Sequence, residues 1–281
     1  MILDFYTLKG YLGIDGDAED SIIKLLHQRA EARVKSILDR EFESTTYYET
    51  YDGTGNNHLY LPQYPIIAVS YLGTKADAVK IKNTSTDANN AYVTIDDTNM
   101  TLTVSGGTNA GTTTLALATY STLTLLIAGI NAAGKGWSAE LYDSDYSAYL
   151  SANLIKFENC FVGSWDGTAA AYDCLPMIDE PFSGYIVYGK EGEGYIYYPG
   201  GFPKGHQNIA IKYTAGYSSV NMPYDLQGLI SDIVSMKYNE KANDLIGIKQ
   251  YRRGEFSITY GDVTSIDGFD QIYTKYQKVR L

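Results

Sequence analysis

The sequence contains few cysteines and few histidines. Among its 281 residues there are two Cys and three His. Two cysteines cannot make a disulfide scaffold, so a reducing compartment is expected, and Cys160 and Cys174 are interpreted as free core thiols unless their strands pair. No two histidines have the i, i+4 spacing of a His-Glu-x-x-His motif, and no Cys-x-x-Cys is present. We therefore predict no metal and no cofactor, and structural or solvent-exposed roles for His27, His58 and His206.

Long apolar runs and an excess of positive charge are also missing. The most apolar stretch, residues 123–130, is too short to span a bilayer, which takes about 18 apolar residues. The first residues, Met1 to Asp4, lack the basic region of a signal peptide. With 22 Lys and Arg against 33 Asp and Glu, the formal net charge is −11, which argues against a dedicated nucleic-acid surface. We expect no membrane association and no specific DNA binding.

Catalytic motifs are incomplete, so no enzymatic activity is predicted. Residues 136–140, Gly-Trp-Ser-Ala-Glu, lack the second glycine of a nucleophile elbow. Gly189, Gly192 and Gly194 precede a Tyr-rich strand rather than a helix, which favours a hairpin turn over a phosphate loop. Acidic clusters at 15–20, 96–97 and 143–145 lack the ligand spacing of a calcium loop. Carboxylates of a glycoside hydrolase would meet only in the fold, so that class stays open as the weakest alternative.

Two amphipathic helices are the clearest elements that are present. Residues 17–40 carry apolar side chains at helical spacing, and Asp17 is in position to cap the helix. Pro223 opens a second amphipathic helix that runs to about Glu240. Each helix is expected to pack one face and to expose the other to solvent.

The segments next to these helices have the patterns of strands. Residues 45–51 and 58–61, separated by the turn cluster 52–57, predict a β-hairpin, and a short strand is expected over 66–71. Residues 195–198 and 209–214 also alternate, and 247–260 is interpreted as an extended arm or hairpin. The 27 tyrosines suit half-buried strands and protein interfaces.

Residues 75–190 differ in composition, and up to Thr114 they are dominated by Thr, Asn, Asp, Gly and Ala. Strands are predicted around 92–95 and 102–104, a helix within 115–134 closed by Gly134, a short helix over 143–154, and short strands over 157–178. We interpret 76–194 as a mixed β/α domain, β-rich with one or two helices, inserted into a smaller parent domain.

The order of segments outside this block resembles the head–tail connector proteins, also called adaptor or head-completion proteins, of long-tailed bacteriophages. The first matching segments are a lead-in at 8–14 and the helix that ends in Asp-Arg-Glu-Phe-Glu (39–43). After them come Tyr-Asp-Gly-Thr-Gly (51–55), Leu-Tyr-Leu-Pro (59–62) and Tyr-Pro-Ile (64–66). Later come Phe-Pro-Lys-Gly (202–205), Ile-Lys-Tyr-Thr-Ala-Gly-Tyr (211–217), Met-Pro-Tyr-Asp-Leu (222–226), Gly-Glu-Phe-Ser-Ile-Thr-Tyr (254–260) and a basic C-terminus. The resemblance covers about residues 1–75 and 195–281.

The resemblance implies an α+β fold, in which a connector core of amphipathic helices and β-hairpins (1–75 and 195–281) is interrupted by the insertion 76–194. It implies a structural virion protein of the neck, assembled in the host cytoplasm. Copies would form a ring, with about twelve subunits by analogy with closed cyclic assemblies. The ring would join the portal protein of the head to a neck, stopper or tail-completion protein and extend the channel for DNA ejection.

Three sets of residues are candidates for these contacts. An acidic channel would let DNA slide without sticking, and the candidate lumen-facing acids are Glu19, Asp20, Glu31 and Asp232. A basic tail suits docking on an acidic groove of the portal, through Tyr273, Lys275, Tyr276, Lys278 and Arg280. Strand addition to a neighbouring subunit is expected from Arg252, Arg253, Phe256, Ile258 and Tyr260. Solvated helix faces and a frayed terminus are the plain alternatives.

A carbohydrate- or receptor-binding module of a tail or baseplate is the alternative function. Aromatic rings in the insertion would stack on sugars, and the candidates are Trp137, Tyr142, Tyr146, Tyr149, Trp165 and Tyr172. Aromatic packing in a core explains the same residues.

Overall fold

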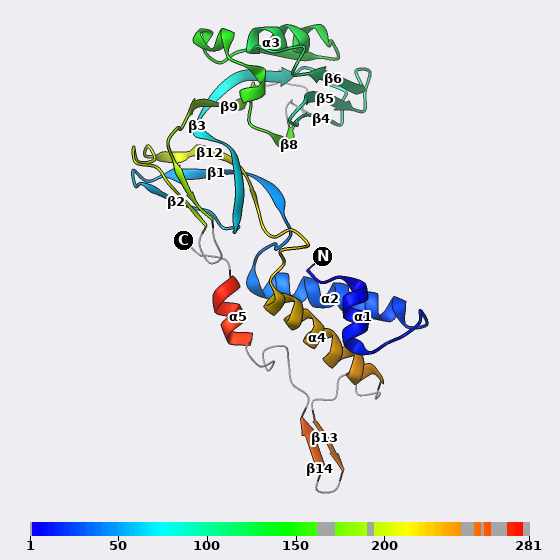
Figure 1. The fold of residues 1–281 in the computed structure, drawn as a ribbon. Helices are drawn as coiled ribbons and strands as arrows, with labels where there is room; N and C mark the ends of the chain where they lie inside the picture. The colour runs from blue at the N-terminus through cyan, green and yellow to red at the C-terminus, as the bar shows by residue number, and fades with distance from the viewer. Residues whose placement is uncertain are drawn as a thin grey trace.

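The computed structural model describes residues 2–161, 172–189, 194–242, 250–253, 256–259 and 269–277. It is an α+β fold with three parts in a row (Figure 1). Helices from both ends of the chain form a helical unit, antiparallel strands form a middle sheet, and residues 78–177 supply the core of an outer unit. Within the described residues, no helix is both long and apolar enough to cross a membrane.

The helical unit combines α1 (Phe5–Leu12) and α2 (Asp20–Leu38) with α4 (Tyr224–Ala242) and α5 (Phe269–Tyr276). Its core takes one apolar face from each helix and includes Leu8, Ile23, Val34 and Ile230. The helix predicted over 223–240 is confirmed. Two short helices, α1 and α5, lie where the sequence analysis expected a lead-in and a basic tail.

The start of α2 differs from the prediction because Asp17 is not its cap. The helix begins at Asp20, and the N-cap residue Glu19 makes no side-chain capping hydrogen bond. Asp17 and Asp20 instead flank the ammonium group of Lys9, at 3.5 and 2.6 Å from Nζ. Lys9 is buried, so the carboxylates around it offset the cost of taking a charge out of water.

The predicted hairpin over 45–61 is wrong in its pairing. Strand β1 (Thr45–Gly53) pairs with β12 (Gly205–Ala215), and β2 (His58–Tyr60) pairs with β11 (Tyr195–Tyr197). The turn between β1 and β2 is held by a second loop, since the Gly55 N–H donates to the Phe202 carbonyl at 2.8 Å and the Phe202 N–H donates to the Asn56 carbonyl at 2.9 Å. Both strands therefore take their partners from the far end of the sequence.

Strand β3 (Ile66–Asn83) connects the middle sheet to the outer unit. It pairs with β12 through residues 66–74 and with β9 (Asp173–Pro181) and β7 (Trp137–Leu141) through residues 73–83. The short strand predicted over 66–71 is thus the first third of an 18-residue strand. It runs without a break through position 75, where the inserted domain is predicted to begin.

A small three-stranded sheet flanks the middle sheet. Its order is β10 (Ile186–Tyr188), β11 and β2, all antiparallel. The antiparallel pairing of β10 with β11 agrees with the prediction of a hairpin rather than a phosphate loop between them. Leu59 and Ile196 point from this sheet into the middle core.

The outer unit is built mainly from β4 (Asn90–Ile95), β5 (Asn99–Ser105), β6 (Gly111–Ala116), β8 (Phe157–Phe161) and α3 (Leu123–Ala132). The alternating runs 92–95 and 102–104 are strands, as predicted. The helix predicted within 115–134 is shorter, because Leu115 and Ala116 belong to β6. The helix predicted over 143–154 consists of two 3₁₀ turns, η1 (Ser144–Ala148) and η2 (Ser151–Asn153).

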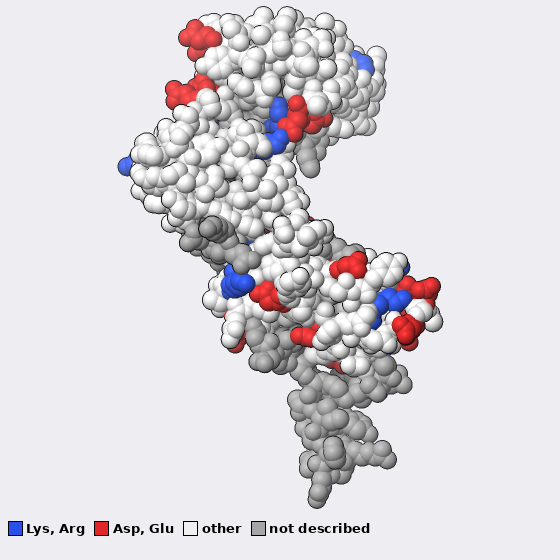
Figure 2. All heavy atoms as spheres, viewed as in Figure 1, with Lys and Arg blue, Asp and Glu red and all other residues white. Residues whose placement is uncertain are grey.

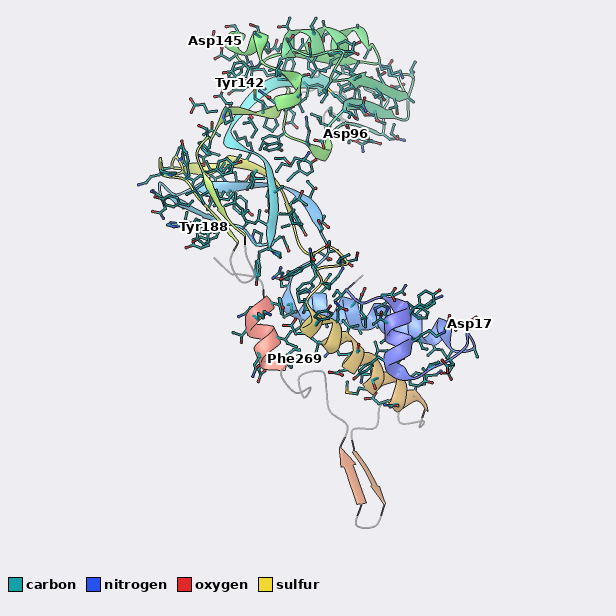
Figure 3. The ribbon with its side chains drawn as sticks, viewed as in Figure 1. Asp17, Asp96, Tyr142, Asp145, Tyr188 and Phe269 are labelled. Atoms are coloured by element: carbon teal, nitrogen blue, oxygen red, sulfur yellow. The ribbon has the colours of Figure 1, made fainter. Side chains whose placement is uncertain are left out.

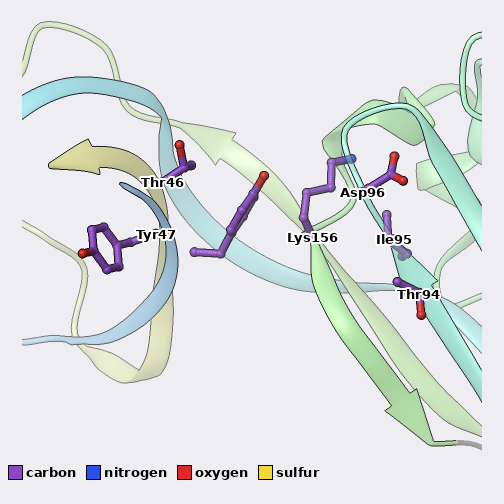
Figure 4. A pocket seen from close by; sticks show the side chains of 7 residues that line it. Thr46, Tyr47, Thr94, Ile95, Asp96 and Lys156 are labelled. Atoms are coloured by element: carbon purple, nitrogen blue, oxygen red, sulfur yellow. The ribbon is translucent and has the colours of Figure 1, made fainter. Parts of the chain in front are cut away.

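Polar contacts fix the outer unit against the middle sheet. Asp97, in the β4–β5 turn, lies 2.6 Å from the ammonium nitrogen of Lys212 on β12. Beside this ion pair is a hollow of about 520 Å³ lined in part by Tyr48, Asp96 and Lys156 (Figure 4). Burial lowers the pKa of Lys156, whose Nζ donates to the Ala152 carbonyl at 3.2 Å.

Candidate assembly surfaces

The four predicted channel acids all lie in the helical unit, and each has a partner there. Asp20 pairs with Lys9, Asp232 accepts from the Tyr11 hydroxyl at 2.7 Å, and Glu19 accepts from the Tyr238 hydroxyl. These bonds join α1 to α4 and the start of α2 to α4. The acids therefore hold the helices together, whatever surface they face in an assembly.

Glu31 is largely enclosed, with 14% of its side chain exposed. Its carboxylate accepts from the backbone N–H groups of Ile2 and Leu3, and its Oε1 lies 3.3 Å from Nε2 of the buried His27. Burial alone would raise the pKa of Glu31, but the His27 imidazole and the backbone donors hold it below its usual value of 4.5. Glu31 thereby ties the N-terminal segment to α2.

The predicted docking tail begins as helix α5 packed on the helical unit. Tyr276 is 1% exposed, its hydroxyl donates to Asp225 at 2.8 Å, and its ring contacts Phe42 edge-on. Lys275 pairs with the same carboxylate at 3.0 Å, whereas Tyr273 is 38% exposed. A buried Tyr276 is not available as an anchor, so its proposed part in docking needs α5 to move.

The end of α5 is held by a buried arginine. Arg40 is 4% exposed, and its Nη1 donates to the Tyr276 carbonyl at 3.3 Å. Its guanidinium lies 3.6 Å from the ring centroid of Tyr64, whose hydroxyl donates to the Gln277 carbonyl at 3.0 Å. A cation at the C-terminus of a helix is favourable to the helix dipole. Lys278 and Arg280 lie outside the described residues.

The predicted inter-subunit arm contains a two-stranded hairpin, β13 (Gln250–Arg253) with β14 (Phe256–Thr259). Arg253 is paired with Phe256, Arg252 with Ser257, and Tyr251 with Ile258. Tyr260 lies outside the described residues. Figure 1 shows the hairpin beyond the end of α4, at the opposite end of the molecule from the outer unit.

The aromatic residues proposed for sugar stacking differ in how far they are exposed. Trp137 is 5% exposed and belongs to the core of the outer unit, so it is not available to a ligand. Tyr142 and Tyr172 are exposed, each next to a lysine of β3. Tyr146 and Tyr149 pack on each other with centroids 5.2 Å apart and against the core. Trp165 is not among the described residues.

A gathering of aromatic side chains that the sequence analysis did not single out lies on the three-stranded sheet. The register places Tyr188, Tyr195 and Tyr60 in one row across the strands, and Ile186, Tyr197 and His58 in the next. We call these six residues the aromatic face; Tyr188 is labelled in Figure 3. The alternation His-x-Tyr and Tyr-x-Tyr was visible in the sequence, but the register that aligns these residues was not.

The cysteines and histidines do not come together in a metal site within the described part of the chain. Cys174 is a free, half-buried thiol on β9, and Cys160 is on β8, which belongs to a different sheet. His206, for which a structural or solvent-exposed role is predicted, is exposed on β12, and its Nδ1 is 3.0 Å from Asp52. Among described residues there is no group of three or more His, Cys, Asp or Glu able to hold a metal ion.

Comparisons with known proteins give weak likenesses. No family model matches the chain, and no curated protein matches it. Two solved structures are similar over all of this chain and 91% of theirs, both at 11% identity. One is the neck of an empty gene transfer agent particle computed with C6 symmetry (TM-score 0.41), and the other is the virion of a native gene transfer agent particle (TM-score 0.42). Scores of this size establish neither a shared fold nor a shared function.

Proposed function

We propose that this chain is a structural, non-enzymatic subunit of the neck of a tailed phage or phage-like particle. Copies would form a ring between the portal of the head and a neck or tail protein and would extend the DNA channel. The observation that carries the proposal is the helical unit. Segments from both ends of the chain, in the order typical of head–tail connectors, fold together so that α2 packs against α4.

The shape of the molecule supports assembly with further copies. The parts lie in a row rather than around one core, and the β13–β14 hairpin projects beyond the helical unit (Figure 1). An isolated two-stranded hairpin is marginally stable in water, so it gains from contact with a neighbour. A head-to-tail contact of this kind closes into a ring when the rotation between neighbours allows it, and about twelve subunits remains the expectation.

The charge of the chain supports passage of DNA without binding. A carboxylate that accepts a hydrogen bond from a tyrosine keeps its negative charge, so Glu19 and Asp232 still contribute to a repulsive potential. Asp20 contributes less, because Lys9 neutralises it. The visible face of the helical unit carries both signs of charge, and most of the visible face of the outer unit is uncharged (Figure 2). In the proposal, repulsion comes from the net charge of −11 rather than from those four acids alone.

The proposal also treats residues 76–194 as an insertion carried by the connector core. The outer core is formed within one continuous stretch, residues 78–177. Because β3 and β9 connect it to the middle sheet as an antiparallel pair, its entry and exit lie side by side, as an insertion requires.

Ring formation is tested with the purified full chain. Light scattering and negative-stain imaging should show monomers that assemble into closed rings, alone or on the portal protein. Replacing residues 250–259 by a short Gly-Ser linker should abolish rings while leaving the helix content unchanged, and Tyr142→Ala in the outer unit is the matched control. Absence of the chain from the neck of purified particles would refute the proposal.

A further inference from the structure

The aromatic face carries no charged side chain and is partly exposed. Tyr60 is 43% and Tyr188 39% exposed, and Ile186 is 49% exposed. The rings of Tyr188 and Tyr195 stack with centroids 4.6 Å apart, and His58 lies 5.3 Å from Tyr197. None of its six positions carries Lys, Arg, Asp or Glu, although one residue in five of the chain is charged. Scattered surface hydrophobics are ordinary, but a row of tyrosines in register is a feature of binding surfaces.

Two hollows adjoin this face and share Asn56, His58 and Tyr60 as lining residues. One, of about 400 Å³, is completed by Gly55, Asn57 and Tyr197. The other, of about 480 Å³, also takes Asp52, His206 and Gln207, together with Thr50, Tyr51, Thr54, Leu59 and Phe202. His58 and Tyr60 thus form an aromatic ridge between two hollows whose polar groups are amides, hydroxyls, one carboxylate and one further imidazole.

The loops that line the hollows are held in place before any ligand arrives. The 55–57 turn is bound to the 198–202 loop by three backbone hydrogen bonds of 2.8 to 2.9 Å, the third from the Tyr198 N–H to the Asn57 carbonyl. The Asn57 amide also donates to the Pro199 carbonyl at 3.3 Å. A Cβ on Gly53 would lie 1.7 Å from the Pro203 oxygen, so only glycine permits this approach. Preorganised polar groups bind ligands at a lower cost in entropy.

One lining residue has a backbone conformation that a glutamine rarely adopts. Gln207 has φ of 45°, in the left-handed region. Asp52 holds it there, since the carboxylate accepts from the Gln207 N–H at 2.6 Å, and the same carboxylate lies 3.0 Å from the His206 imidazole. Local strain of this kind gathers at ligand sites. The Asp52, His206 and Gln207 group is not explained by packing of the core, because all three are exposed.

The lining chemistry selects one class of ligand. Among the described residues that line the two hollows there is no Lys or Arg; the stem of Lys204 passes Gly55 at the rim. Phosphates and acidic sugars need such cations, so they are disfavoured. Aromatic rings present a negative face to the C–H groups of a sugar ring, and amides, carboxylates and imidazoles hydrogen-bond its hydroxyls. We propose that the aromatic ridge and its two hollows bind a neutral saccharide.

This site is separate from the assembly role proposed above and from the aromatic residues of the outer unit. It lies on β2, β10 and β11 and on the loops at 50–57 and 198–207. A protein carrying both functions would present the saccharide site on the middle part of each subunit, away from the helical unit. The binding measurement therefore does not depend on whether the chain forms rings.

The test uses saturation-transfer NMR and calorimetry on the folded full chain. The probes are neutral trisaccharides built on glucose, galactose or N-acetylglucosamine, a sialylated trisaccharide and a proline-rich peptide. We expect binding of at least one neutral trisaccharide, with saturation transferred from tyrosine ring protons. Tyr60→Ala and Asn56→Ala should each weaken it about tenfold, the size expected when one aromatic or hydrogen-bonding contact is lost.

The matched control is Tyr142→Ala, an exposed tyrosine of the outer unit, which should bind as the parent chain does. Asn56→Ala keeps the backbone hydrogen bonds of its turn. Its affinity for the trisaccharide therefore tests the site even if Tyr60→Ala does not fold. Three outcomes would overturn the proposal: no neutral trisaccharide binds, binding is unchanged in both site variants, or only the sialylated sugar or the peptide binds.

Discussion

The outer unit and the helical unit draw their buried cores from different parts of the chain. The outer core comes from residues 78–177, one continuous stretch, and Val93, Leu102 and Leu126 in it are fully buried. The helical core joins residues 2–42 to residues 217–276, so its parts meet only after most of the chain has been made. Local contacts form faster than contacts between distant segments. We therefore expect the outer unit to fold by itself, whereas the helical unit needs both ends of the chain.

The polar contacts of the two units also differ in how far apart along the chain the bonded residues lie. Paired acids join separate helices in the helical unit, as with Tyr11 to Asp232 and Tyr276 to Asp225. Many side-chain hydrogen bonds of the outer unit join residues close in sequence, for example Thr98 to Asp96 and Ala139 to Asn131. The helical unit is therefore expected to respond to pH and to the loss of a single partner, whereas the outer unit is expected to respond mainly to packing.

The largest test of this comparison removes the outer unit. Lys75 and Ile178 are opposite each other in the antiparallel β3–β9 pair, so a two-residue Asn-Gly turn can replace residues 76–177. We expect the shortened chain to keep the helical signal in circular dichroism and to unfold cooperatively. A shortened chain that loses its helices would show that the two units fold as one.

Matched core truncations are the next test. Ile230→Ala in α4 and Leu102→Ala in β5 each empty a fully buried position, at a cost of about 3 kcal/mol. Both tryptophans lie in the 76–194 segment, so fluorescence follows that segment, and circular dichroism at helical wavelengths follows mainly the helical unit. We expect Leu102→Ala to shift the urea unfolding transition seen by fluorescence. Ile230→Ala should shift the transition seen by circular dichroism. Equal shifts of both signals by either variant would contradict independent units.

The pH dependence of the helical unit is predicted from Glu31. A carboxyl whose pKa is lowered in the folded protein contributes stability above its unfolded pKa and loses it as pH falls through the folded value. Glu31→Gln should therefore cost about 1–2 kcal/mol at pH 7, and the difference from the parent chain should shrink below the ordinary glutamate value of 4.5. Urea unfolding at pH 7, 4.5 and 3.5 measures it. A constant difference across this range would show that the charge of Glu31 does not matter.

The smallest effect is expected at the contact between the middle sheet and the outer unit. Asp97→Asn removes the ion pair with Lys212, and because Asp97 is 58% exposed the loss of stability should stay below about 1 kcal/mol. The variant should instead broaden the range of orientations of the outer unit, as seen in small-angle scattering. Glu140→Gln, which removes an exposed pair with Lys80, is the control and should leave the scattering unchanged.

Long amphipathic elements were predictable from the sequence, and short or paired ones were not. The stripes in α2 and α4 identify both helices, because a helix buries one face whatever it packs on. The α1 and α5 helices have eight residues each, too few for a periodic signal. Strand patterns at 45–51 and 58–61 were correct, but the assumption that they pair with each other was wrong. Alternation reveals a strand and its faces, and it does not name the partner strand.

For the candidate surfaces too, the residue types were predictable from the sequence and their burial and contacts were not. The acids, the basic tail and the arm could be listed from the sequence, but only the structure shows that Tyr276 is buried on Asp225 and that Glu31 holds the N-terminal segment. The aromatic face needed the register of three strands from two distant parts of the chain.

The sequence by itself determined the acidity of the chain, its mixed helix and strand content and the different composition of its central part, because these follow from residue types and their local period. The tertiary structure decided the strand partners, the burial of Tyr276 and Trp137 and the alignment of Tyr188, Tyr195 and Tyr60. These depend on contacts between residues far apart in the chain, where many pairings satisfy the same local pattern and only the packing of the whole molecule selects one.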